Sequence, residues 1–284
     1  MEHINYMKGE ATISEEGAYV SSLILDGIPI LQGSIDGYKT HGGLSVLIPY
    51  ADIVYESRYT FEGIEYSLPR NATYEHDLKN SIHGLTNDIK WRIRKRGEGY
   101  LNLACSVENS GYPSRLGVTV TYRLGYHKFV VGISLKNTGE KTCPVMAGLH
   151  PYFISDGKWR IEFSDPLVSL MGITDKEVQS DSLNLLAMTS FDALDSSTKI
   201  FDDSFFGGGK LILRTETSSL ELVRKNMPFF SLYNGPFAPR NSFSIIPMTA
   251  APNAFNNKFG LKVLYPMETF RCSFSLRLLG KKSV

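Results

Sequence analysis

Short segments in which apolar and polar residues alternate recur along the whole chain, and they constrain its fold more than any other feature. The clearest is 270–279, where Phe270, Cys272, Phe274, Leu276 and Leu278 alternate with polar residues. Successive side chains of a β-strand point to opposite faces, so this pattern predicts a strand with one buried and one solvent-facing side. Further strands are predicted at 19–31, 59–68, 90–95, 100–108, 117–124, 129–135, 159–163, 210–213, 220–223, 229–233 and 243–246.

Helical patterns are confined to short turns near 174–178 and 250–256. Many short strands separated by glycine, asparagine and proline predict an all-β fold, a large antiparallel sandwich or barrel. Such folds can reach the length of this chain, 284 residues, as one domain. Because no linker or shift in composition divides the sequence, we expect a single domain spanning residues 1–284.

The composition is that of an ordinary globular protein, with 42% hydrophobic and 21% charged residues. The net charge of +1 predicts no binding to nucleic acid or to an anionic membrane surface. The first residues lack the basic start and apolar stretch of a secretory signal, and no apolar run is long enough to span a bilayer. We therefore expect a soluble cytoplasmic protein. Its three cysteines form no CxxC pair, which indicates neither a zinc site nor a disulfide framework.

Two histidines lie within short apolar and aromatic stretches, at 80–84 and 147–153. Histidine is the side chain whose ordinary pKa allows proton donation and acceptance near neutral pH. Two such segments, well separated in sequence, predict a site assembled from different strands. The alternative is that both are core or loop histidines with satisfied hydrogen bonds.

Several ordered segments resemble the aldose 1-epimerase family, the galactose mutarotase-like proteins. They are Pro49–Asp52, Arg58–Tyr66, Ile82–Gly84, Gly148–Phe153, Phe201–Phe205 and Pro247–Asn256. The resemblance covers nearly the whole chain and implies the family's fold, a large antiparallel β-supersandwich.

This resemblance implies chemistry at the anomeric carbon of a free, hexose-like sugar. Family members interconvert α and β anomers: a base takes the proton of the anomeric hydroxyl, an acid protonates the ring oxygen, and the ring opens and closes on the other face. Such a reaction needs two proton-transfer groups whose pKa values lie near the working pH. It needs no metal or organic cofactor. The sequence likewise contains no HxH, HExxH or carboxylate-rich loop. We expect no cofactor.

Carried over position by position, His150 corresponds to the family's general acid, and His83 to a histidine that hydrogen-bonds sugar oxygens. Asp202 corresponds to an acidic residue that binds sugar hydroxyls, and its alternative is a plain turn residue. Asp52 replaces a polar family residue beside the sugar. Tyr152 is a candidate for the wall of the cleft, or simply part of the core.

Two departures from the family pattern put catalysis in question. Ile246 stands immediately before Pro247, where the family has its general-base glutamate, and isoleucine cannot accept a proton. The Asn-Arg pair that usually follows the early Pro-aromatic segment is replaced by Asp52 and Ile53. A positioned general base contributes roughly 10²–10⁴-fold to a rate. Candidate replacements are Asp52, Asp202, Asp203 and Glu268.

Three hypotheses therefore remain open at this point. The first is an aldose 1-epimerase with a relocated base. The second is a carbohydrate-binding or regulatory protein on the same scaffold that has lost catalysis. The third is a structural sandwich whose cleft no longer binds sugar.

Overall fold

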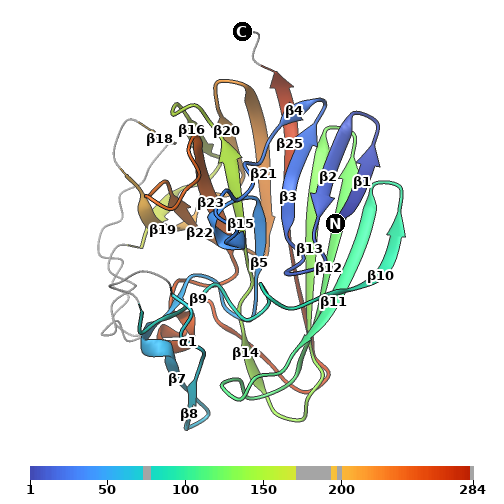
Figure 1. Cartoon of the computed structure of the whole chain (residues 1–284). Helices are drawn as coiled ribbons and strands as arrows, with labels where there is room; N and C mark the ends of the chain where they lie inside the picture. Colours follow the sequence, from blue (N-terminus) through green and yellow to red (C-terminus); the bar gives the residue numbers. More distant parts are fainter. Residues whose placement is uncertain (73–77, 171–192, 197–199, 282–284) are drawn as a thin grey trace.

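Segments with alternating apolar and polar residues form the strands of two large antiparallel sheets in the computed structural model (Figure 1). The structure describes residues 1–72, 78–170, 193–196 and 200–281. Every strand pair in these sheets is antiparallel, and among the described residues helix is limited to short turns. The all-β prediction and the large antiparallel sandwich are confirmed.

The first sheet has ten strands and carries the histidine segment at 147–153. In spatial order they are β1 (Glu2–Tyr6), β2 (Gly9–Ile13), β3 (Val20–Leu25), β5 (Leu44–Leu47), β15 (Gly148–Ile154), β23 (Ser242–Met248), β22 (Phe229–Tyr233), β19 (Asp202–Gly207) and β17 (Leu167–Ser169), with β4 (Ile28–Pro29) beside β3.

The second sheet has nine strands and supplies the other half of the core. Their order is β10 (Arg92–Gly97), β11 (Tyr100–Val107), β12 (Leu116–Gly125), β13 (Lys128–Asn137), β25 (Thr269–Lys281), β21 (Ser218–Lys225), β20 (Leu211–Arg214), β16 (Arg160–Phe163) and β18 (Ala193–Asp195). Three two-stranded pairs complete the strands: β6 (Ile53–Val54) with β9 (Ser81–Ile82), β7 (Arg58–Phe61) with β8 (Ile64–Ser67), and β14 (Cys143–Val145) with β24 (Lys262–Leu264). The short helical elements are η1 (Lys39–His41), η2 (Tyr55–Ser57) and α1 (Ala254–Asn257).

The core lies between the two sheets. Phe163 of β16 and Phe230 of β22 stack across it with ring centroids 6.3 Å apart, and Trp159 stacks on Phe243 at 4.6 Å. In β22 the side chains alternate, so Phe230 and Leu232 face this core while Ser231 faces the other way. The ten-stranded sheet thus has an apolar inner face and an outer face that is available for a site.

The local predictions were largely correct where alternation is strong. The segment 59–68 forms the β7–β8 hairpin, closed by Glu62 and Gly63, both with positive φ as a two-residue type I′ turn requires. The predicted turn near 250–256 contains α1, whereas 174–178 lies outside the described residues. The N-terminal strands β1 and β2 were not predicted. Each is only five residues long, and β2 is held by hydrogen bonds to β1 and β3.

In the described part of the chain, no helix combines the length and apolar character needed to cross a membrane. All three cysteines are free in this structure.

Candidate functional site

The floor of the candidate site is a row of side chains across the outer face of the ten-stranded sheet. His150 on β15 pairs with Ser45 of β5 on one side. On the other side, the pairs Gly148–Met248 and Tyr152–Ser244 place His150 opposite Ile246 of β23. Ile246 pairs with Ser231 of β22, and Ser231 with Ser204 of β19. Residues in lateral register point to the same face, so His150, Ile246, Ser231 and Ser204 share one surface.

A second row lies two residues further along each strand and faces the same way. It contains Tyr152, Ser244, Tyr233 and Asp202, each paired with the next across the sheet. Asp202 is therefore part of strand β19 and exposed at the edge of the site; the alternative of a plain turn residue is wrong. Its position in a strand depends on pairing with Tyr233, which lies 31 residues away.

Segments from the first third of the chain form the wall above this floor. Ile53 of β6 pairs with Ile82 of β9, and the backbone N–H of His83 donates to the carbonyl of Asp52 at 2.9 Å. Gly84 follows with φ +81°, and a Cβ there would lie 2.4 Å from the carbonyl oxygen of Ile48. Only glycine fits this close approach, which holds the His83 segment against the sheet.

Floor and wall enclose a cavity of about 290 Å³, near the lower end of the sizes typical of small-molecule sites. It is lined by Thr40, Asp52, Ile53, Tyr55, Ile82, His83, His150, Tyr152, Asp202, Ser204, Ser231, Tyr233 and Ile246. The five residues selected from the sequence therefore meet in one place: His150, His83, Asp202, Asp52 and Tyr152. The serines and Tyr233 were missed, because a serine or tyrosine in an alternating strand carries no chemical signature of its own.

His150 is held in one tautomer by Ser244. The Ser244 hydroxyl donates its single hydrogen to the carbonyl of Pro151 at 2.8 Å, so it accepts at its other contact, 3.0 Å from Nδ1 of His150. Nδ1 therefore carries a hydrogen. In the neutral ring, Nε2 then has a lone pair and carries a proton only when the imidazole is charged.

Burial keeps this imidazole neutral. His150 is only 3% exposed, and desolvation followed by the nearby His83 lowers its pKa well below the ordinary value. The two histidine rings meet edge to face with centroids 5.0 Å apart. The pKa of His83 is lowered to about 4, mainly by desolvation and secondarily by His41. At neutral pH, both rings of the pair are uncharged.

Tyr152 fixes the plane of the His150 ring. The two rings stack at 4.7 Å and 11°, and the Tyr152 hydroxyl donates to the carbonyl of Thr40 at 3.0 Å. Thr40 lies on η1, so this bond also ties the wall of the cavity to its floor. Tyr152 is thus 1% exposed and belongs to both the packing and the lining of the site.

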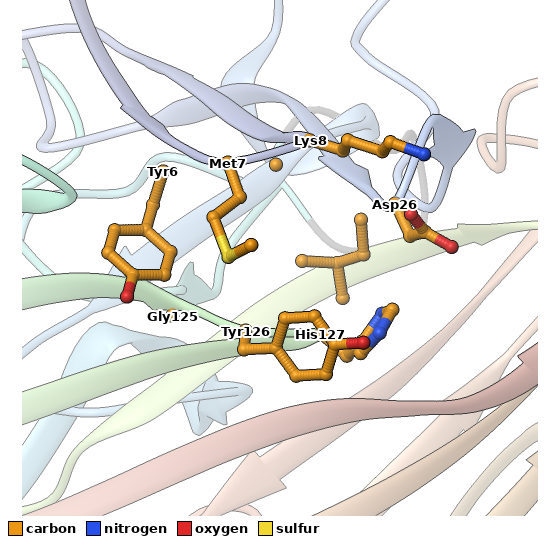
Figure 2. A pocket seen from close by; sticks show the side chains of 9 residues that line it. Tyr6, Met7, Lys8, Asp26, Gly125, Tyr126 and His127 are labelled. Carbon is orange, nitrogen blue, oxygen red and sulfur yellow. The ribbon is translucent and has the colours of Figure 1, made fainter.

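Other cavities lie in the described part of the molecule. A larger cavity of about 740 Å³ adjoins it and shares Thr40, Ile82 and His83. Figure 2 shows a third, of about 260 Å³, at three hairpin turns that include Met7, Asp26 and His127; it shares no residue with the site. No cluster of three or more possible metal ligands occurs within the described ranges.

The family model described as aldose 1-epimerase matches residues 3–277. The chain belongs to the aldose 1-epimerase family. Among curated relatives, an uncharacterised Escherichia coli K12 protein, YihR, is 27% identical over 246 residues, covering 81% of this chain and 77% of that protein. The aldose 1-epimerase of E. coli K12 is 30% identical over 165 residues, which is 55% of this chain and 45% of that enzyme.

Solved structures of the family share the fold. A putative aldose 1-epimerase from E. coli K12 superimposes with a TM-score of 0.78 at 19% identity, covering 97% of each chain. A galactose mutarotase-like protein from Lactobacillus casei also gives 0.78, at 16% identity over 98% of this chain and 99% of that one. These likenesses establish the galactose mutarotase-like β-supersandwich, whereas the chemistry must be argued from the residues of the cavity.

Proposed function

We propose that this protein binds a free aldose and interconverts its α and β anomers by opening and closing the sugar ring. The observation that carries this proposal is the meeting of His150, His83, Asp52 and Asp202 in one cavity of a size suited to a small ligand. Carboxylates and imidazoles bind hydroxyl groups strongly, and an imidazole can transfer a proton to or from the ring oxygen.

In this proposal His150 is the general acid. Its Nδ1–H bond to Ser244 can form in the charged and in the neutral ring, so the ring can gain and lose a proton at Nε2 without turning. His83 and Asp202 bind sugar hydroxyls, and Tyr152 packs beside the sugar and orients His150. The hexose-like substrate, independence from cofactors and nucleic acid, and a cytoplasmic location remain predictions from the sequence.

The alternative is a carbohydrate-binding protein without catalysis, and Ile246 favours it. This aliphatic side chain lines the cavity directly beside His150, at the position of the family's glutamate, and is 4% exposed. Binding needs no proton acceptor at that point, whereas anomer interconversion needs one somewhere in the cavity.

Polarimetry of freshly dissolved α-glucose and α-galactose separates the two functions. We expect the protein to accelerate the approach to the equilibrium rotation beyond the rate in buffer. A rate equal to that of buffer for several aldoses, together with heat of binding in calorimetry, would favour the binding protein. Absence of both acceleration and binding would exclude both functions.

The pH dependence tests the role of His150. Because its pKa is lowered, only a small fraction of the ring is protonated at neutral pH, and that fraction grows roughly tenfold for each pH unit of acidification. If the charged ring is the acid, kcat/KM should rise as pH falls from 8 to 6, after subtraction of the buffer rate. The titratable groups around this ring are His83, His41, Tyr55, Tyr152, Tyr233 and the two cavity carboxylates. A rate that stays constant over the same interval would instead fit neutral His150 as a proton acceptor, because the neutral form predominates throughout.

A further inference from the structure

Ring opening needs a group that accepts the proton of the anomeric hydroxyl, and Ile246 cannot do so. Among the described residues that line the cavity, the carboxylates are Asp52 and Asp202. Asp202 is exposed at the end of the second row. Asp52 is half-buried in the wall and contacts the first row, the row that contains His150.

A chain of hydroxyl groups positions the Asp52 carboxylate. Ser231 donates its hydrogen to Oδ2 of Asp52 at 3.0 Å. The second contact of Ser231, with the hydroxyl of Ser204 at 2.7 Å, must then be donated by Ser204. Ser204 and Ser231 pair on adjacent strands of the sheet, so the donors that hold the carboxylate belong to its rigid floor.

This contact places the carboxylate close to the position that isoleucine occupies. Ser231 pairs directly with Ile246, and His150 lies opposite Ile246 on its other side. Adjacent strands are about 4.8 Å apart, so His150 and the serine that binds Asp52 are separated by about two such spacings. The distance leaves room for a sugar ring between the imidazole and the carboxylate, with Ile246 beneath it.

The backbone of Asp52 is held in a conformation that aims its side chain into the cavity. Its φ is +59°, in the left-handed region that few residues other than glycine, asparagine and aspartate adopt. Its carbonyl accepts the N–H of His83 at 2.9 Å, so the same residue fixes the histidine segment of the wall. Left-handed residues of this kind cluster at functional sites.

We propose that Asp52 is the proton acceptor of this enzyme, an assignment that rests on the function proposed above. Asp52 removes the proton from the anomeric hydroxyl, and the released electron pair forms the carbonyl at C1. The bond from C1 to the ring oxygen breaks, and that oxygen takes the proton from Nε2 of charged His150. After rotation about the C1–C2 bond, the reverse steps return both protons and close the ring on the other face.

The first test is Asp52→Asn, with Asp203→Asn as the matched control. Asparagine has the shape of aspartate, accepts from Ser231 and tolerates positive φ, so the fold and sugar binding should persist. We expect kcat to fall about 10²–10⁴-fold with little change in KM. Asp203 precedes Ser204 on β19 and so points to the opposite face of the sheet. Its variant should retain the wild-type rate.

The second test is rescue by an added carboxylate. Asp52→Gly removes the side chain, and glycine adopts the positive φ without strain. Formate should restore part of the lost rate in this variant and leave the wild-type rate unchanged, a response that a merely structural role would not produce.

The outcomes distinguish the two proposals. If the wild-type protein is active and Asp52→Asn retains its rate, or formate restores nothing to Asp52→Gly, Asp52 is not the acceptor and the proposed function still stands. If the wild-type protein accelerates no aldose at any pH, both proposals are overturned.

Discussion

Replacing His150 with asparagine is expected to slow anomer interconversion by about 10²–10⁴-fold, the contribution typical of a positioned acid or base. The asparagine amide can still donate to Ser244 in place of Nδ1–H, which limits the structural damage. What the variant lacks is Nε2, the nitrogen proposed to exchange a proton with the sugar. Polarimetry at the pH of highest wild-type activity measures the loss of rate. Thermal unfolding tests whether the variant is folded.

His127→Asn is the matched control for this substitution. His127 lies in the cavity of Figure 2, which shares no residue with the site, and its φ of +52° is one that asparagine adopts readily. This variant should keep the wild-type rate. If His150→Asn keeps it too, His150 has no part in proton transfer and the site must work without it.

The largest loss of stability is expected from Phe230→Ala. Phe230 is fully buried on the inner face of β22, its ring 5.2 Å from that of Phe205 and 6.3 Å from that of Phe163 in the facing sheet. The guanidinium carbon of Arg224 lies 4.9 Å from its centroid. Removing such a ring deletes buried apolar surface and leaves a cavity between the sheets, which costs about 3–5 kcal/mol of unfolding free energy.

Phe206→Ala provides the comparison, because Phe206 is on the neighbouring strand β19 but is 36% exposed. The loss of unfolding free energy in Phe206→Ala should be clearly smaller, since water already reaches part of the ring. Urea unfolding followed by tryptophan fluorescence measures both values. Equal losses in the two variants would mean that the interface between the sheets does not carry the stability assigned to it.

Much of the fold was predictable because alternation is a local property. The segment 270–279 alternates strongly enough that the sequence indicates both the strand and its buried face, and 59–68 is recognisable as a hairpin by the Glu-Gly turn between its aromatic and branched residues. The N-terminal strands β1 and β2 escaped prediction because each is only five residues long, and their strand conformation depends on pairing. Asp202 and Asp203 look like a turn in isolation and become part of a strand through register with β22.

The candidate site was also predictable only in part from the sequence. His150, His83, Asp202, Asp52 and Tyr152 were selected from short motifs and the family resemblance, which also implies that Ile246 stands in place of a glutamate. The contact from Ser231 to Asp52 was not visible, because it joins residues 179 positions apart.

By itself, the sequence determined that this chain builds antiparallel sheets, and its resemblance to the aldose 1-epimerase family implied an aliphatic residue at the position expected of the base. Only the tertiary structure decided which carboxylate approaches that position and which tautomer His150 adopts. The physical reason is that side-chain alternation is set by each strand alone, whereas hydrogen bonds across a cavity depend on strand register and on the loops folded above it.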